Sequence, residues 1–254
     1  MKRRIHFEIR PQPDDMTCGP TCLHALYAYY GDEIPLSQVI AEVPQWKKGG
    51  TLAVLLACHA LTRGYSATIY SYNMRVFDPT WFESKRIDIK EKLRAELEYK
   101  ERAKLRFAIR SYLQFVELGG EVQLSDLKRR LIYKYLQGGT PILTGLSATY
   151  LFRTPREYGP ASDYDDLRGE PSGHFVVLCG YDKATRRVLV ADPLYPNPMS
   201  ENNFYEVNID RLICSILLGV LTYDANLLII QPPEARRDNP CPSLSSSITP
   251  KPGR

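Results

Sequence analysis

The sequence predicts an α+β fold, because segments with helical periodicity gather in its first half and strand-like segments in its second half. An apolar run after Gly173, a Gly-Tyr-Asp turn and a second β-branched run predict an antiparallel hairpin. Between residues 88 and 117, apolar residues recur mostly at intervals of four within a charged stretch. That pattern predicts one long amphipathic helix or two helices with a bend. The chain of 254 residues, 44% of them hydrophobic, is large enough to bury a full core.

The elements expected before the charged stretch follow from local signals. Alternation at residues 5–9 predicts an edge strand, which a proline-rich loop then ends. A helix is expected at 21–30, because Pro20 is favoured in a first turn and Gly31 can adopt the left-handed conformation that ends a helix. The other elements expected here are short or medium in length: helices at 37–43 and 52–62 and a strand at 67–72.

After the charged stretch, Ser125 is expected to cap a helix at 126–137. The remaining expected elements are a strand at 141–146, a long loop at 149–173, hairpin strands at 174–179 and 187–191, and strands at 204–207 and 226–230 that flank a helix at 209–220. We expect one domain at 1–230, with a helical insertion at about 77–120, the long loop at 149–173 and a disordered tail at 231–254 that is rich in Pro and Ser.

The small net charge of +4 is unevenly distributed. Residues 83–134 contain fourteen Lys or Arg and nine Asp or Glu, whereas the rest of the chain is nearly balanced. A basic helical lobe can attract an acidic substrate or nucleic acid, but mixed-sign helices are more often solvated faces. We therefore expect no nucleic-acid partner.

The composition also points to a cellular compartment. The N-terminal segment lacks an apolar stretch of signal-peptide length, and the longest apolar run, 212–221, is about half of a membrane span. The six cysteines lack the spacing of a disulfide framework, which suits reduced thiols. We expect a cytoplasmic protein with no membrane association.

Cys18 differs from the other cysteines because it stands at the start of an expected helix. Unpaired backbone N–H groups and the positive end of the helix dipole favour its thiolate, which is the reactive form. The other cysteines of the chain body are expected to be core residues: Cys22, Cys58, Cys179 and Cys214. A zinc site is disfavoured by the spacing, and we expect neither a metal nor a cofactor. The ligands considered for such a zinc site are Cys18, Cys22, His24, Cys58 and His59.

His174 is the best candidate for a base that serves this thiolate, because it opens the buried strand of the expected hairpin. Asp192 ends the partner strand, so the two side chains can meet at the same end of the hairpin. A carboxylate in that position fixes the tautomer of an imidazole. Cys18, His174 and Asp192 together suit nucleophilic amide chemistry.

Five features, in the same order along the chain, resemble one enzyme family. Gln12 stands six residues before Cys18, and Cys-Gly-Pro-Thr starts the helix. Gly-Thr-Leu opens the second long helix, Gly-His-Phe-Val-Val forms the first hairpin strand, and Ala-Asp-Pro ends the second. They resemble the bacteriocin-processing, double-glycine cysteine peptidases, over roughly residues 8–75 and 122–230.

The resemblance implies a papain-like fold with an N-terminal catalytic helix and a C-terminal antiparallel sheet, to which this chain adds a charged helical lobe. It implies Cys18 as the nucleophile, His174 as general base and acid, and Asp192 as the residue that orients His174. It also implies Gln12 and the Cys18 backbone N–H as oxyanion donors. The best-known members precede an exporter, of which this chain shows no segment, so export-coupled leader cleavage is not implied.

The expected function is hydrolysis of a peptide or isopeptide bond through an acyl-enzyme on Cys18. Two alternatives stay open: a transpeptidase that passes the acyl group to an amine, and a non-catalytic papain-like module that binds a partner through its basic lobe. The expected partner is a peptide or protein substrate, with an acidic composition left open. Segments 77–120 and 149–173 lie outside the family pattern, so we expect them to set the substrate, the second as a lid or wall over the cleft.

Overall fold

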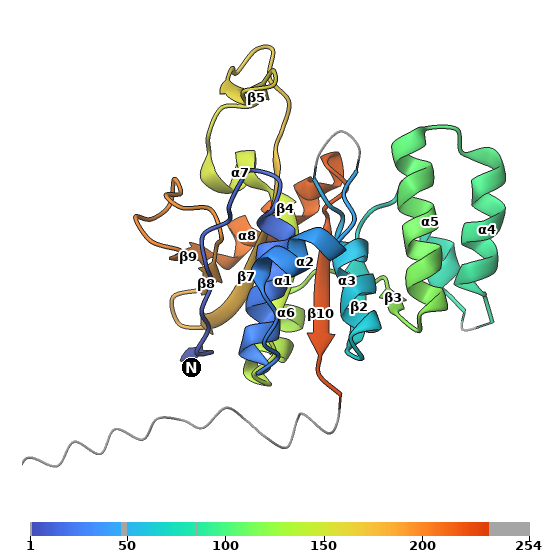
Figure 1. Ribbon diagram of the computed structural model, residues 1–254, viewed down its shortest axis with the longest axis horizontal. Coiled ribbons are helices and arrows are strands. Elements are labelled where there is room, and N and C mark those ends of the chain that lie inside the picture. Colours follow the sequence, from blue (N-terminus) through green and yellow to red (C-terminus); the bar gives the residue numbers. More distant parts are fainter. Residues whose placement is uncertain (1, 47–49, 85, 234–254) are drawn as a thin grey trace, which may run out of the picture.

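The computed structural model describes residues 2–46, 50–84 and 86–233 (Figure 1). The helices described are α1 (Cys18–Tyr29), α2 (Leu36–Glu42), α3 (Ala53–Thr62), α4 (Ile89–Tyr99), α5 (Ala103–Glu117), α6 (Arg129–Gln137), α7 (Ala148–Phe152) and α8 (Ile209–Leu218), with short 3₁₀ turns η1 (Pro79–Phe82) and η2 (Gly219–Leu221). The strands are β1 (Lys2–Arg4), β2 (Ser66–Ser71), β3 (Glu121–Gln123), β4 (Ile142–Ser147), β5 (Glu157–Tyr158), β6 (Asp163–Tyr164), β7 (Gly173–Asp182), β8 (Arg187–Ala191), β9 (Phe204–Asn208) and β10 (Asn226–Gln231).

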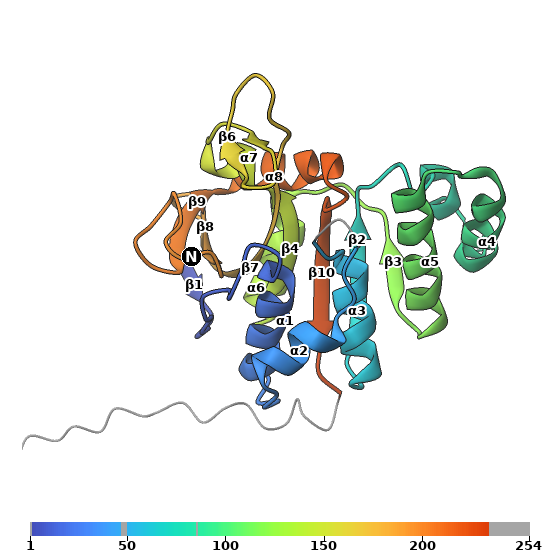
Figure 2. The same ribbon diagram turned by 45° about the horizontal axis from the view of Figure 1, so that its top comes forward.

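The expected α+β fold is confirmed, and its centre is a mostly antiparallel sheet. Within the described ranges the strand order is β3-β2-β10-β4-β7-β8-β9, and β1 pairs with the end of β7. Helix α1 packs against β7, and α3 packs against β2 and β10. Helices α6 and α8 pack against β4 and β7 from the other side (Figure 2). This double cover explains why β7 has a continuous apolar sequence, since its residues 174–181 are all buried.

The charged insertion forms a pair of helices beside the β3 edge of the sheet (Figures 1 and 2). The periodicity of this segment predicted either one long helix or two helices with a bend. Two helices are observed, because the helix breaks between Tyr99 and Ala103. Helix α5 buries the apolar face that its spacing predicts, including Leu105, Ile109 and Tyr112, and packs against α3. Arg106 closes the break by donating hydrogen bonds to the carbonyls of Leu97 and Lys100.

Three predicted element starts are wrong by three residues. The helix expected at 21–30 starts at Cys18. The strand expected at 5–9 lies at Lys2–Arg4, while Ile5 and Phe7 are buried in the core, so their alternation reflects core contact and not a strand. Helix α6 starts at Arg129 and not at 126, and Lys128, which precedes it, makes no side-chain cap hydrogen bond. Ser125 is therefore not the cap.

Residues 149–173 are also more ordered than the long loop expected from their composition. They contain most of α7 and the hairpin of β5 and β6. Asp165 holds the end of this hairpin, since its carboxylate accepts hydrogen bonds from the backbone of Leu167 and Arg168 and from the Arg168 side chain. The Arg168 guanidinium lies over the Tyr158 ring, 4.5 Å from its centroid. The segment therefore has its own internal contacts.

Three chain segments meet where the strands of the sheet end, at the top of the sheet in Figure 1. Strand β4 ends at Ser147, which pairs with Gly173 at the start of β7. Helix α1 begins at Cys18 beside the same strand. None of the described helices combines the length and apolar character that a membrane crossing needs. From residue 234 onward, the expected tail lies outside the described residues.

Candidate active site

The first turn of α1 is held against the start of β7. Cys22, one helical turn after Cys18, is buried, and its thiol donates a hydrogen bond to the Phe175 carbonyl at 3.3 Å. Gly19 lets the helix approach, because a Cβ at this position would lie 2.6 Å from Thr51 Cγ2 and 3.2 Å from Phe175 Cδ2. The start of α1 therefore lies next to the residue that follows His174.

His174 is buried, and its Nε2 atom lies 2.7 Å from Asp192 Oδ1. Because an ionised carboxylate only accepts hydrogen bonds, Nε2 donates to Asp192, and Nδ1 remains available for another partner. Burial lowers the pKa of His174, but the charge and hydrogen bond of Asp192, with the contribution of Cys18, outweigh it and raise the pKa well above its ordinary value. The imidazolium form is thus favoured beside Cys18.

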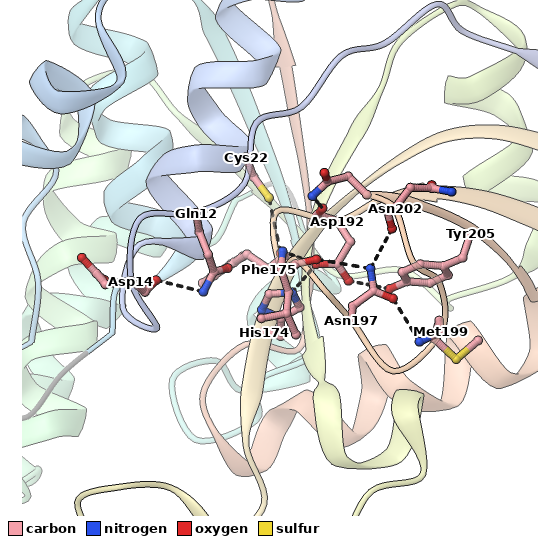
Figure 3. Close-up of polar contacts among 12 residues, drawn as sticks. Gln12, Asp14, Cys22, His174, Phe175, Asp192, Asn197, Met199, Asn202 and Tyr205 are labelled. Carbon is pink, nitrogen blue, oxygen red and sulfur yellow. Dashed lines mark hydrogen bonds and ion pairs between the residues drawn. The ribbon is translucent and has the colours of Figure 1, made fainter.

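Asp192 is fully buried and has a hydrogen-bond partner on each oxygen (Figure 3). Oδ1 accepts from His174 and, at 2.8 Å, from the Leu194 backbone N–H. Oδ2 accepts from the Tyr205 hydroxyl at 2.7 Å. Burial and the charge of Asp192 raise the pKa of Tyr205 well above its ordinary value, so this hydroxyl stays protonated and donates. Asn203 fixes the backbone by donating its side-chain N–H to the Asp192 carbonyl at 2.7 Å.

Tyr205 and Asn203 were not among the residues singled out from the sequence. A usable signal existed for Tyr205, since it occupies an inward position in the strand expected at 204–207, beside the second hairpin strand. Asn203 lies in the turn before that strand, where no periodicity applies. Its role depends on the pairing of its carbonyl with the Asp192 N–H at 2.8 Å, which only the folded chain reveals.

Gln12 lies in a loop that is anchored to the same region (Figure 3). Its backbone N–H donates to the carbonyl of Pro193, next to Asp192, at 2.8 Å. Its side-chain Nε2 donates to the Asp14 carbonyl at 2.9 Å, and Thr17 Oγ1 donates to the same carbonyl at 3.0 Å. An amide nitrogen carries two hydrogens, so one Nε2–H remains for another acceptor.

The remaining histidines lie apart from this cluster. His59 is buried between the Tyr27 hydroxyl, 2.7 Å from Nδ1, and a Glu42 carboxylate oxygen, 2.9 Å from Nε2. His24 is partly buried, and burial and the charge of Arg10 lower its pKa. The zinc ligand set considered above is thus divided among separate contacts, and the described residues hold no group of three metal-ligating side chains.

Of the four cysteines expected in the core, three are buried: Cys22, Cys58 and Cys179. Burial raises the pKa of Cys58 and of Cys179 to about 12, which keeps both as inert thiols. For Cys214 the prediction is wrong, because this residue lies on the exposed side of α8. Cys241 is outside the described residues.

The chain is similar to several solved structures. A solved structure of a putative C39-like peptidase from Bacillus anthracis is similar at 12% identity and a TM-score of 0.50, over 92% of this chain and 98% of that one. Xylellain, a cysteine protease from Xylella fastidiosa, is 13% identical over 92% of this chain and 86% of that one, with a TM-score of 0.44.

A double-glycine motif protease from an AMS/PCAT transporter, solved with its leader peptide, is 15% identical over 91% of this chain and 95% of that one, with a TM-score of 0.43. No curated protein matches the chain. The model of the peptidase C39-like family matches residues 4–210, most of the chain, which agrees with the resemblance seen in the sequence. The chain therefore belongs to the peptidase C39-like family.

Proposed function

We propose that this protein is a cysteine peptidase that cleaves a peptide or isopeptide bond through an acyl-enzyme on Cys18. The observation that carries the proposal is the buried His174–Asp192 pair, 2.7 Å apart, whose imidazole lies close enough to Cys18 at the start of α1 for Cys18 to help raise the pKa of His174. Family membership supports the reaction class. The residue roles rest on the geometry.

In the proposed reaction, His174 holds the proton of Cys18, so that a thiolate faces an imidazolium. The sulfur attacks the scissile carbonyl and forms a tetrahedral oxyanion. The oxyanion collapses, the C–N bond breaks, and His174 gives its proton to the departing amine. His174 then takes a proton from a water molecule, whose oxygen attacks the thioester and releases the acid and Cys18.

Two donors are available for the developing oxyanion. The backbone N–H of Cys18 belongs to the first turn of α1, where no earlier helical carbonyl can accept it. The free N–H of Gln12 Nε2 is the second donor, and the bond from the Gln12 backbone to Pro193 keeps its loop beside Asp192. Donors fixed in advance stabilise the transition state without reorganisation.

The first test measures alkylation by iodoacetamide, because it needs no knowledge of the substrate. Cys18 should react below the pH that an ordinary thiol requires, whereas the exposed Cys214 serves as an internal reference within the same chain. Mass spectrometry of each modified peptide gives both rates. Equal rates for the two thiols at pH 6 would contradict an activated Cys18.

The second test incubates the protein with a mixed peptide library and detects cleavage by mass spectrometry. Cys18→Ala should abolish cleavage, and Cys214→Ser should leave it unchanged. An added amine nucleophile separates hydrolysis from transpeptidation, since only the latter yields amide products. Cleavage that survives Cys18→Ala would rule out the proposed acyl-enzyme.

A further inference from the structure

A cavity of about 540 Å³, open to solvent, lies between the helical insertion and the body of the protein. Its walls come from the segment after β2, from the break between α4 and α5, and from Tyr223 in the turn before β10. The volume falls within the range of small-ligand sites. The residue roles proposed above involve none of the residues that line it.

Three cations line the cavity, and two of them lack acidic partners among the described residues. Arg75, Lys100 and Arg102 contribute positive charge, and Glu101 is the acidic residue of the lining. Lys100 pairs with Glu96 at 3.2 Å, but Arg75 and Arg102 take part in no ion pair within the described part of the chain. Arg94, on α4 but outside the lining, is satisfied by both Glu91 and Glu117. Two cations that are unpaired among the described residues, Arg75 and Arg102, therefore lie at the cavity.

Tyr223 belongs to the body of the protein and contacts cations at the cavity. Its ring lies 4.9 Å from Lys104 Nζ and 5.7 Å from the Arg75 guanidinium carbon, so two cations flank one aromatic side chain. Its backbone has a φ of 76°, in the left-handed region that a bulky side chain seldom adopts. The cost of this conformation is offset by surroundings that hold the turn in place.

The same turn reaches the proposed active site. Thr222 and Asp224 flank Gly173, where a Cβ would lie 2.6 Å from Thr222 Oγ1 and 2.4 Å from Asp224 Oδ2. Gly173 directly precedes His174. Asp224 is buried, and the charges of both Lys104 and His174 act on its carboxyl group. Three consecutive residues thus connect the surroundings of His174 with the basic cavity.

We propose that this cavity is a specificity subsite that binds an acidic side chain of the peptide substrate. This side chain lies farther along the peptide than the substrate residues that pass the 222–224 turn. The proposal rests on the proposed function, because it assigns the occupant to the peptide cleaved at Cys18. A carboxylate suits the lining, since Arg75, Arg102 and Lys100 offer charged donors there.

The test is a binding assay on the full chain with Cys18→Ala, which prevents turnover. Labelled peptides, amidated at the C-terminus, carry a single Glu at successive positions, and each has a Gln counterpart. At one or two adjacent positions the Glu peptide should bind about tenfold more tightly than its Gln counterpart. Adding Arg75→Gln and Arg102→Gln should bring that ratio close to one.

A matched control removes equal charge elsewhere, through Arg110→Gln and Arg130→Gln, both exposed and outside the cavity lining. The control should keep the Glu preference. The proposal is overturned if Glu and Gln peptides bind equally at every position, or if the control loses the preference as fully as the cavity variant. N-acetylglutamate that binds the cavity as tightly as the Glu peptide would assign it to a free carboxylate and also overturn the proposal. Binding is measured without turnover. The subsite proposal can therefore fail while the proposed cleavage reaction holds, and the reverse can also occur.

Discussion

The two oxygens of Asp192 have different partners, and the difference determines what each substitution does. Oδ1 holds His174 and the Leu194 N–H, while Oδ2 holds only the Tyr205 hydroxyl. An asparagine at this position can still accept from His174 and Leu194 through its carbonyl oxygen. Its amide nitrogen then faces Tyr205, whose hydroxyl can rotate and accept.

Asp192→Asn should therefore leave partial activity, reduced about 10- to 100-fold, as for other residues that orient a catalytic ligand. Burial then lowers the pKa of His174 with no carboxylate charge to oppose it, so the imidazolium deprotonates at lower pH. The alkaline limb of the kcat/KM profile for peptide cleavage should move to lower pH, because neutral His174 cannot protonate the departing amine. An unshifted limb in the folded variant would mean that Asp192 does not control the charge of His174.

Tyr205→Phe is the complementary variant, since it removes the donor to Oδ2 and keeps the carboxylate charge. It should cost about 1–3 kcal/mol of unfolding free energy, because a buried carboxylate oxygen loses its partner. In the Asp192→Asn background the cost should fall, since the charge is gone. Denaturant titration of the four proteins measures the coupling, and an equal cost in both backgrounds would argue against it.

Gln12→Ala should lower kcat about 10²- to 10³-fold through the loss of one oxyanion donor, with alkylation of Cys18 almost unchanged. The Gln12 side chain also donates to the Asp14 carbonyl, so the variant needs a control for loop support. Thr17→Val removes the other side-chain donor to the Asp14 carbonyl and keeps the side-chain amide of Gln12. If Thr17→Val reduces kcat as strongly as Gln12→Ala, Gln12 supports the loop and does not contact the oxyanion.

The element boundaries show which sequence signals were sufficient to predict a helix or a strand. The hairpin of β7 and β8 follows directly from its apolar runs and turn, because burial on both faces leaves a continuous pattern. The position of β3 was not predicted, since three residues are too few for an alternation to be recognised. The hairpin of β5 and β6 was also missed, because it is held by the polar contacts of Asp165 and not by apolar periodicity.

The same contrast applies to the candidate site. Cys18, His174 and Asp192 each mark the end of an element, and such positions can be recognised in a sequence. Tyr205 and the 222–224 turn act through tertiary contacts between segments that are distant from their targets in the chain. No local pattern carries that information.

The segment with α7 and the β5–β6 hairpin is expected to form a wall beside the cleft. Phe152, the last residue of α7, lies 6.1 Å from the His174 ring, measured between centroids. Replacing the residues between Arg153 and Arg168 by a Gly/Ser linker removes the hairpin and keeps Phe152. We expect kcat/KM to change unequally among peptides, while alkylation of Cys18 stays equal or becomes faster. An unchanged peptide profile in the folded variant would assign specificity to the helical insertion alone.

The stability of the whole molecule should depend on pH through Asp224. Burial raises its pKa from 3.8 to about 7, against the lowering effects of Thr222, Lys104 and His174. Between pH 4 and 7 the folded chain keeps a proton that the unfolded chain releases, so this group stabilises the fold at low pH and the stabilisation is lost as pH rises to about 7. The loss amounts to at most about 4 kcal/mol at 1.4 kcal/mol per pKa unit.

Asp224→Asn should remove this dependence, so the variant gains stability relative to the wild type between pH 4 and 8. Urea unfolding of both proteins across this range gives the difference, which cancels the contributions of titrating groups that do not interact with Asp224. A constant difference at all pH values would show that Asp224 is ionised in the folded chain even at low pH.

The order of strands in the sheet has a consequence for how the protein is made. Strand β10 lies between β2 and β4, although it follows every other described strand along the chain. During synthesis the helix with Cys18 leaves the ribosome early, while His174, Asp192 and Tyr205 follow some 150 to 190 residues later. The sheet that supports them lacks the strand between β2 and β4 until residues 226–231 are translated. A nascent chain therefore carries its thiol long before the rest of the candidate site, and the complete site assembles only once synthesis has passed β10.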